Sequence, residues 1–484
     1  MPVFISLTVF DGISQENNKL KKTVWETEIF SSLSNGNYSP FWLNSNSYGR
    51  ISTKGTNAYM LVGIKHKQSI CKDLVFHTGI SIVAAEPRYK TAYIEELFGE
   101  LTFKKFRLAI GSFKNYTSLW DERLSTGDMV YSNNARPIPE INISIPTFTT
   151  IPFTKGWIQI KGDFALGKSF DNSYLEQYVN PGTTYIQSVL WHHKSAHFKI
   201  SNTQSDFPIE LTLGFQHWAQ WGGTSSNAKI GKQPQSIRDM LKVIAGSSGG
   251  SNATISDQIN VLGNHLGSYD MAIAWKSMNF KLMGYHQLYW EDKSGIELST
   301  GTDGLWGIEL SLNKFKWIDK IVLEHFITMN NGGPFHFIDF DHETWPGRGG
   351  GGERYYNNGE YTTGTSYFNR GIGNPLLPGP VYNEEGILGF SNTRVKDWHL
   401  GMSGSLSKNI NYRILCTYMN TYGKPDRPFR DIKKGVSGLI DINYKHPKLK
   451  DWDFTGSLAA DRKELFGNNL GFSLKIKKTG VLTH

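Results

Sequence analysis

Residues 263–312 read GNHLGSYDMAIAWKSMNFKLMGYHQLYWEDKSGIELSTGTDGLWGIELSL, and they carry the pattern that decides the fold. Apolar side chains recur at alternate positions in three successive runs, at 271–275, 280–290 and 306–312, while polar, charged or small residues such as Asp270 stand between them. A period of two places successive side chains on opposite faces of a β-strand. The stretch therefore predicts three half-buried strands joined by two turns.

The same alternation returns in the last third of the chain, where the face opposite the apolar one carries groups such as Asp441, Asn443 and Lys475. A β-sandwich would bury these groups between its sheets, at a cost of roughly 2–7 kcal/mol for each one left unpaired. A transmembrane barrel instead places them in a polar lumen and turns its apolar and aromatic residues toward lipid. The sequence thus predicts an all-β fold, a transmembrane antiparallel β-barrel of about 16–18 strands with a small helical or irregular plug.

Composition agrees with a barrel and excludes other classes. The chain has 484 residues, including 50 glycines and 13% aromatic residues. None of its apolar runs reaches the roughly 18 residues that a membrane-spanning helix needs, so any spanning structure has to be a closed barrel. The net charge of +8 comes from interspersed residues, which is weak evidence for acidic partners and none for nucleic acid. Cys71 and Cys416 lie far apart, so we expect no disulfide framework.

One barrel domain is expected over residues 23–484, after a remnant signal or disordered segment at 1–22. Residues 2–10 are apolar and small residues follow them, as at the end of a secretory signal, although a plain first strand would give the same pattern.

Three segments interrupt the alternation. Residues 115–152 contain four prolines, which central strands exclude, so we expect a mostly non-strand, plug-like insertion. Residues 221–266 are a second plug-like insertion, with a helix at 236–245 that Ser236 can cap and a second short helix or turn at 257–266. Residues 330–394 form a long loop, expected on the extracellular side.

Several motifs resemble those of the capsule assembly Wzi family, in its Bacteroidetes-type variant, and they keep the family's order over most of the chain. They are SPFWLNSNSYG at 39–49, SNNARPIPEI at 132–141, IPFTKG at 151–156, HHK at 192–194, WGGT at 221–224, GNHLG at 263–267, EDKSG at 291–295 and DGLWG at 303–307. The resemblance implies an 18-stranded outer-membrane barrel with a periplasmic helical plug, to which the helix at 236–245 would belong. It also implies a lectin that holds capsular polysaccharide at the cell surface.

Other motifs give weaker signals. GDFALGKS at 162–169 matches a phosphate-binding loop, but its apolar residues continue the alternation of a strand and no helix follows, so nucleotide binding is not expected. Residues 339–343 carry three carboxylates, which suit a solvated acidic loop, a Ca²⁺ site or an acid–base pair. His192 and His193 point to opposite faces of a strand and are poor joint metal ligands.

Carbohydrate binding is predicted for the long loop. Sugars stack their C–H faces on aromatic rings, and their hydroxyl and carboxylate groups bind Asn and Arg. We therefore expect alanine at Arg354 or Tyr356 to weaken glycan binding, although the same residues would suit a loop that folds on itself over the barrel mouth. The predicted binding residues are Trp345, Arg348, Arg354, Tyr355, Tyr356, Asn357, Asn358, Tyr361, Tyr367 and Arg370.

The sequence as a whole predicts a lectin-like barrel in a Gram-negative outer membrane that binds and attaches capsular polysaccharide or exopolysaccharide. An outer-membrane channel for glycans or small solutes, and a surface enzyme acting on glycan or lipid, are the alternatives. The expected partners are the polysaccharide and outer-membrane lipid, with no nucleic acid, and the protein is expected to be a monomer. No catalytic residue, cofactor or metal is assigned.

Overall fold

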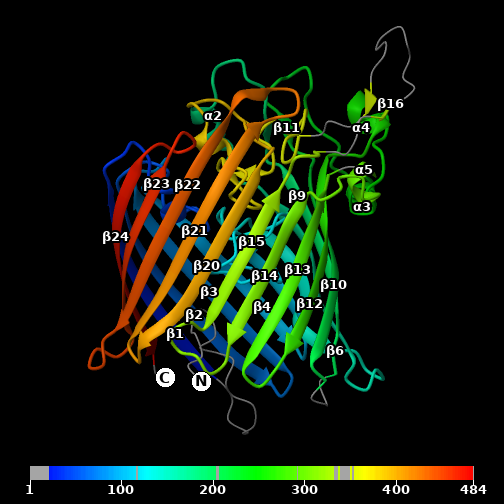
Figure 1. Ribbon diagram of the computed structural model, residues 1–484. Helices are drawn as coiled ribbons and strands as arrows, with labels where there is room; N and C mark the ends of the chain where they lie inside the picture. The colour runs from blue at the N-terminus through cyan, green and yellow to red at the C-terminus, as the bar shows by residue number, and fades with distance from the viewer. Residues whose placement is uncertain are drawn as a thin grey trace.

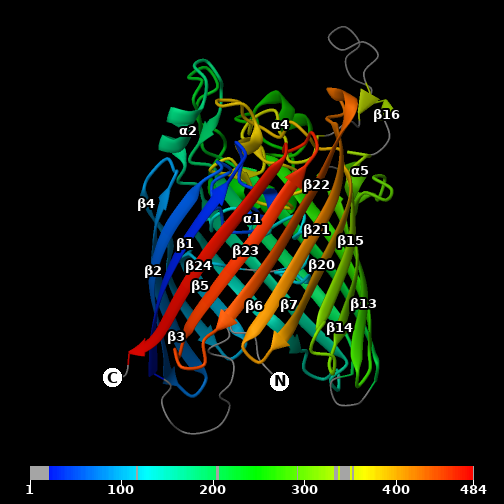
Figure 2. The same cartoon turned by 60° about the vertical axis from the view of Figure 1, so that its left-hand side comes forward.

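A closed β-barrel is the dominant feature of the computed structural model, which describes residues 21–115, 118–202, 207–291, 293–331, 336–337, 349–350 and 354–482 (Figures 1 and 2). Its sheet has 18 antiparallel strands. The first strand, β1 (Lys21–Ser34), pairs with both β2 (Asn57–Cys71) and the last strand, β24 (Asn469–Leu482), so the sheet closes on itself. This confirms the predicted fold class.

Each barrel strand pairs with the barrel strand that follows it along the chain. The remaining barrel strands are β3 (Leu74–Glu86), β4 (Ala92–Phe103), β5 (Phe106–Ser112), β6 (Glu140–Thr150), β7 (Ile158–Lys168), β9 (Leu190–Ile200), β10 (Ile209–Trp221), β12 (Asn264–Lys276), β13 (Phe280–Trp290), β14 (Gly304–Leu312), β15 (Lys320–Ile327), β20 (Lys396–Ser407), β21 (Ile410–Gly423), β22 (Pro428–Lys445) and β23 (Trp452–Arg462).

Short elements lie between the barrel strands. The helices are α1 (Phe41–Asn44), α2 (Asn172–Tyr178), α3 (Ile237–Ala245), α4 (Ile255–Ile259), α5 (Lys293–Ile296) and the 3₁₀ turn η2 (Pro380–Tyr382). Two-residue strands form three small hairpins or bridges, β8 (Ile186–Gln187) with β11 (Thr224–Ser225), β16 (His336–Phe337) with β17 (Gly349–Gly350), and β18 (Ser366–Tyr367) with β19 (Arg370–Gly371). Among the described residues, no helix is long and apolar enough to cross a membrane.

The two faces of the wall differ as the alternation predicted. On β12, Ile273 and Trp275 are exposed on the outside, while Asp270 is fully buried on the inside. Asp270 accepts hydrogen bonds there from Gln216 Nε2 at 2.8 Å and Gln287 Nε2 at 3.0 Å. Apolar groups therefore face lipid, and the lumen holds hydrogen-bonded polar groups such as Asp270.

The two rims of the barrel are unequal. Strand β1 begins and β24 ends at the rim drawn at the bottom of Figures 1 and 2, which also carries short turns such as 72–73, 104–105 and 408–409. We call this the terminal rim. The opposite one, the loop rim, carries the long segments, including 222–263 and the described parts of 328–395. Outer-membrane barrels keep short turns on the periplasmic side and long loops outside the cell.

Residues 118–139 run inside the barrel, and we call them the lumen segment. The carboxylate of Glu324 on β15 accepts hydrogen bonds from Ser125 Oγ at 2.6 Å and from the Thr126 N–H at 2.7 Å. Trp120 stacks on Tyr285 of β13, with ring centroids 4.3 Å apart. Both contacts hold the segment against the inner wall.

The stretch predicted to be irregular, 115–152, is not irregular throughout, because its last part forms β6. Proline lacks an N–H group and cannot complete a regular ladder. The structure accommodates Pro146 where the register between β6 and β7 shifts, between Ile145 and Thr149, and Pro139 and Pro152 flank the strand. The expectation that prolines exclude strands overlooked this bulge.

The helix predicted at 236–245 forms as α3, but its position differs from the predicted one. Ser236 Oγ accepts from the Asp239 N–H at 3.2 Å, and the Asp239 carboxylate accepts from the Ser236 N–H at 2.9 Å, which is a capping box. Figure 1 shows α3 outside the wall near the loop rim, whereas a periplasmic plug would lie at the terminal rim. Sequence alone could not place it, because caps and an apolar stripe are local signals.

The Glu324 contacts give a testable expectation for the lumen segment. Glu324→Ala removes the acceptor for the Ser125, Thr126 and Tyr285 donors, which should destabilise the packed segment by about 2–4 kcal/mol. We expect higher single-channel conductance in planar bilayers and faster proteolysis of residues 118–139. The exposed Glu385→Ala is the matched control, and equal conductance of the two variants would contradict the account.

Candidate functional site

The predicted binding residues that the structure describes belong to residues 354–394, which we call the mouth segment because it packs on the lumen segment below the loop rim. Tyr355 and Tyr356 are fully buried, and both rings pack edge-on against Tyr289 of β13, at centroid distances of 4.7 and 5.5 Å. The Tyr356 N–H donates to Glu291 Oε1 at 2.5 Å. These tyrosines therefore form part of the core that closes the barrel mouth.

Other predicted residues hold turns of the same segment. Asn357 bonds the backbone of Phe390 through both ends of its amide, and Asn358 Oδ1 accepts from the Tyr361 N–H at 3.0 Å. Tyr361 is buried, and Arg354 is exposed beside Asp426, at 3.2 Å.

Carbohydrate binding by the predicted residues stays a prediction. The buried tyrosines of this set have no exposed ring face on which a sugar could stack. Substitution of Tyr356 by alanine would remove a packed ring from the mouth, so it tests packing as well as sugar contact. Trp345, Arg348 and the acidic residues 339–343 lie outside the described residues. In the part of the chain that the structure describes, no group of three or more His, Cys, Asp or Glu is placed to hold a metal ion.

Arg370 belongs to a different arrangement at the loop rim, which we call the rim cluster. Its members come from the β3–β4 loop, the start of β4, the end of the lumen segment, α2 and the β18–β19 turn. Figure 2 shows α2 above the loop-rim end of β4. The residues of the rim cluster are Arg88, Tyr89, Tyr93, Arg136, Tyr174, Tyr178, Phe368, Asn369 and Arg370.

Aromatic rings line this cluster and remain partly exposed. Tyr174 stacks on Tyr178 at a centroid distance of 5.5 Å and an interplanar angle of 17°. The same ring meets Tyr89 and Phe368, each at 5.5 Å. The i, i+4 spacing of Tyr174 and Tyr178 places both on one face of α2. The result is a set of rings at the surface, unlike the buried tyrosines of the mouth segment.

Three guanidinium groups lie among these rings. Arg136 sits between Tyr93 and Phe368, with its guanidinium carbon 4.2 and 3.8 Å from the ring centroids, and Arg88 lies 5.0 Å from the Tyr93 centroid. Arg370 is buried and donates to neutral oxygens, including Oδ1 of Asn44 at 3.1 Å.

Among the described residues, none of these three arginines makes an ion pair, although the charge of Glu95 acts on Arg88 and that of Asp171 on Arg136. The buried Nε of Arg88 also lacks a hydrogen-bond partner there. Burial lowers the pKa of Arg88 to about 10, and the neighbouring Arg136 and Arg370 charges act in the same direction. The cluster therefore carries more positive than negative charge beside stacking surfaces, which suits an anion with apolar faces.

Sequence reasoning found only part of this cluster. It singled out Arg370 and its neighbour Tyr367, because they lie in an aromatic and arginine-rich stretch. It missed Arg88, in the β3–β4 loop, and Tyr174, in the short helix α2, because neither lies in a motif or an aromatic-rich stretch. Arg136 lies within the motif SNNARPIPEI, which was the only available signal for it.

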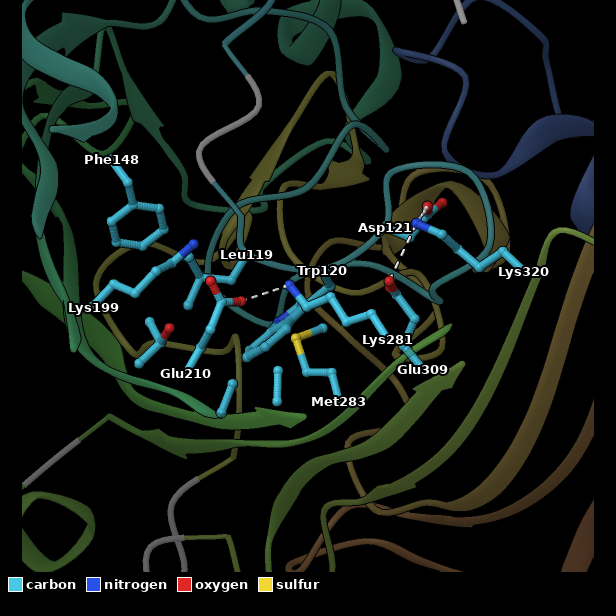
Figure 3. Close-up of a pocket in the computed structure, with 13 residues that line it drawn as sticks. Leu119, Trp120, Asp121, Phe148, Lys199, Glu210, Lys281, Met283, Glu309 and Lys320 are labelled. Carbon is cyan, nitrogen blue, oxygen red and sulfur yellow. Dashed lines mark hydrogen bonds and ion pairs between the residues drawn. The ribbon is translucent and has the colours of Figure 1, made fainter. Parts of the chain in front are cut away.

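A second polar site lies in the lumen near the terminal rim, where Trp120 and several charged residues line a cavity of about 290 Å³ (Figure 3). Its carboxylates are already paired, because Glu210 lies 3.0 Å from Lys281, and Lys320 lies 2.7 Å from Asp121 and 3.2 Å from Glu309. Since its charges balance internally, this cavity has less attraction for a charged ligand than the rim cluster has.

Asp171 links α2 to the β18–β19 turn and makes the rim sensitive to pH. Its carboxylate accepts from the Phe368 N–H at 3.3 Å, and burial raises its pKa from 3.8 to about 6. Asp171 therefore binds a proton more tightly in the folded rim than in the unfolded chain. The stability that this protonation contributes is present below a pH of about 4 and is lost as the pH rises through about 6.

Asp171→Asn keeps an acceptor for Phe368 and removes the titration. Above pH 6 the variant should resist proteolysis in the 169–189 loop better than the parent does. The free energy of local unfolding should be higher in the variant by at most about 3 kcal/mol. The two proteins should converge near pH 4. Glu176→Gln, an exposed change on the same helix, is the control, and a difference between parent and Asp171→Asn that does not vary with pH would refute the assignment.

Comparison with known proteins agrees with this architecture. The structure of Escherichia coli Wzi, described as an outer membrane protein involved in group 1 capsule assembly and a carbohydrate-binding β-barrel, matches with a TM-score of 0.58 and 12% identity, covering 93% of this chain and 83% of that one. Pseudomonas aeruginosa OccK5 (OpdH) matches with a TM-score of 0.48 and 9% identity, covering 96% and 98%. No curated protein sequence matches. The family model for capsule assembly protein Wzi matches residues 37–377, well over half of the chain, so this outer-membrane barrel belongs to the capsule assembly protein Wzi family.

Proposed function

We propose that this protein binds an acidic capsular polysaccharide or exopolysaccharide at its rim cluster and so attaches the polymer to the cell surface during capsule assembly. Membership of the capsule assembly family supports the process. The description of Escherichia coli Wzi as a carbohydrate-binding barrel supports the class of ligand. The position of the cluster at the loop rim, which faces away from the cell in barrels of this kind, supports the location.

The observation that carries the proposal is the grouping of Arg88, Arg136 and Arg370, none of which makes an ion pair in the described part of the chain. A guanidinium group binds a carboxylate through two parallel hydrogen bonds, and a uronic acid presents that carboxylate on a ring whose C–H face can stack on tyrosine. Tyr174 and Tyr178 offer such a surface. The cluster therefore fits an acidic sugar better than a neutral one.

A polymeric ligand also suits a site that has low affinity for a single sugar. A single sugar bound at a partly exposed surface gains only a few hydrogen bonds, but a repeating chain presents the same residue many times. When several copies of the barrel hold one polymer, the later contacts form at high effective concentration. Attachment then follows without any deep pocket.

The channel and enzyme alternatives have less support. The lumen and mouth segments pack together across the barrel, with Tyr356 OH donating to the Met129 carbonyl, which disfavours an open channel. In the inner wall, Ser195 and His193 both bond to the carboxylate of Asp163 rather than to each other. The serine hydroxyl thus donates to a carboxylate and not to the histidine, so the two do not form the Ser–His pair of a hydrolase, and we propose binding without catalysis.

Substitutions at Arg136 and Tyr174 test the proposal with purified barrel and the capsular polysaccharide of the producing strain. Arg136→Ala should weaken binding about 10–100-fold, because a charge-assisted bidentate contact is lost. Arg136→Lys should recover part of the affinity, and Tyr174→Ala should lose a smaller part. Arg427→Ala, an exposed arginine in the β21–β22 turn, is the matched control.

Heat-modifiable migration on gels should show that every variant keeps its barrel. Equal affinity of parent, Arg136→Ala and Tyr174→Ala would exclude the rim cluster as the sugar site. Passage of oligosaccharide through reconstituted parent protein, without saturable binding, would favour the channel instead.

A further inference from the structure

The helices α3 and α4 form a ledge on the outside of the barrel, near the loop rim (Figure 1). Val243 of α3 and Leu262, which follows α4, are buried together with Ala219 and Trp221 of β10 in a separate apolar cluster. Since Ala219 and Trp221 lie at outward positions of β10, the ledge covers a part of the wall that would otherwise face the membrane or its surface.

Polar groups under the ledge explain why the wall is covered there. His265 Nε2 donates to the Leu262 carbonyl at 2.9 Å, and His217 Nε2 lies 2.8 Å from His265 Nδ1. Both histidines are buried although they stand at outward positions of β12 and β10. Lys194, an outward residue of β9, donates to the Ile244 carbonyl at the end of α3. The wall therefore holds the ledge by hydrogen bonds as well as by apolar packing.

The ledge is itself well defined. The capping box at Ser236 begins α3, and Gly246 ends it in the left-handed region at φ 64°, with the Ser247 N–H donating to the Lys242 carbonyl at 2.9 Å. The Gly249 N–H donates to the Asp257 carbonyl of α4 at 2.7 Å. Two short helices joined in this way present fixed faces.

Large apolar side chains remain uncovered on both helices. Ile237 and Leu241 of α3 are 76% and 58% exposed, and Ile255 and Ile259 of α4 are also 76% and 58% exposed. Each pair has i, i+4 spacing, so each forms a stripe along one helix face. Exposing large apolar side chains to water is energetically unfavourable. Both neighbouring helices nevertheless expose such a pair with the same spacing.

Cations accompany the stripe on α3. Arg238 and Lys242 follow Ile237 and Leu241 directly in sequence, and neither makes an ion pair among the described residues. The acidic residues of the two helices, Asp239 and Asp257, are buried. A helix with an apolar stripe flanked by unpaired cations has the composition of helices that lie in a membrane interface.

The height of the ledge matches the edge of the bilayer. A strand rises roughly 3.4 Å per residue and tilts by roughly 40° in a barrel, so the roughly 25 Å apolar band spans about ten residues. On β10 the outward positions begin with the exposed Ile209 and continue through the exposed Leu213. Counted from Ile209, the band ends near Ala219, where the ledge covers the wall. The ledge thus covers the wall where the lipid-facing band of β10 ends.

We propose that α3 and α4 form an interfacial anchor that lies in the outer leaflet around the barrel. Ile237, Leu241, Ile255 and Ile259 insert among the acyl chains, and Arg238 and Lys242 bind the phosphates of anionic lipid headgroups. The anchor fixes the height and tilt of the barrel on one side, independently of any sugar bound at the rim cluster.

Spin-label accessibility in vesicles tests the proposal. Cys71 and Cys416 are free and exposed, so they are first replaced by serine. Nitroxides are then placed by Leu241→Cys and Ile259→Cys in full-length protein, in vesicles of phosphatidylcholine with or without phosphatidylglycerol. Ile273→Cys on the outer face of β12 serves as the lipid-exposed reference, and Ser251→Cys in the loop between the helices as the water-exposed one.

The labels at 241 and 259 should collide with oxygen more often than with a water-soluble nickel chelate, as at 273. Phosphatidylglycerol should deepen the label at 241, and Arg238→Gln with Lys242→Gln should abolish that difference. Accessibility like that at 251 would overturn the anchor, and loss of access to both reagents would show that a protein partner or second copy covers the ledge instead. Equal depth in both lipid mixtures would overturn the phosphate contacts.

Discussion

The constraint on which the structure depends is that every backbone N–H and C=O group at membrane depth must be bonded within the protein. The pairing of β1 with both β2 and β24 meets it, because it leaves no free edge in the 18-stranded sheet. Closure in turn demands alternation, with apolar groups toward lipid and polar groups such as Asp270 toward the lumen. A polar lumen can then form hydrogen bonds with an inserted segment. The carboxylate of Glu324, for example, accepts hydrogen bonds from Ser125 and Thr126.

Closure also gathers distant parts of the chain at one rim. The lumen segment leaves the barrel at Arg136, where the β3–β4 loop, α2 and the β18–β19 turn already meet. Tyr93 and Phe368, more than two hundred residues apart, enclose the Arg136 guanidinium. The buried mouth and lumen segments supply the rigid base, while the partly exposed rings and the guanidinium groups of Arg88 and Arg136 remain for a ligand.

Local patterns explain what could be predicted from the sequence and what could not. Strand alternation and the α3 cap depend on residues that are close together in the sequence, so the fold class and that helix were predicted correctly. The site depends on which loops a closed ring brings together, which no local pattern encodes. The tyrosines at 355 and 356 illustrate the difference, because their composition suits sugar stacking equally well whether they face solvent or, as here, pack on Tyr289. Pro146 in β6 was missed for a similar reason, since a register shift depends on the neighbouring strand.

Charge is the feature that separates the rim cluster from the cavity near the terminal rim, and it permits a direct test. The most decisive measurement is calorimetric titration of the purified barrel with one acidic polysaccharide before and after chemical reduction of its carboxylates to alcohols. If unpaired guanidinium groups at the rim hold the sugar, reduction should abolish most of the binding, and the native polymer should bind more weakly as salt is added. Equal binding of the native and reduced polymers would contradict the account.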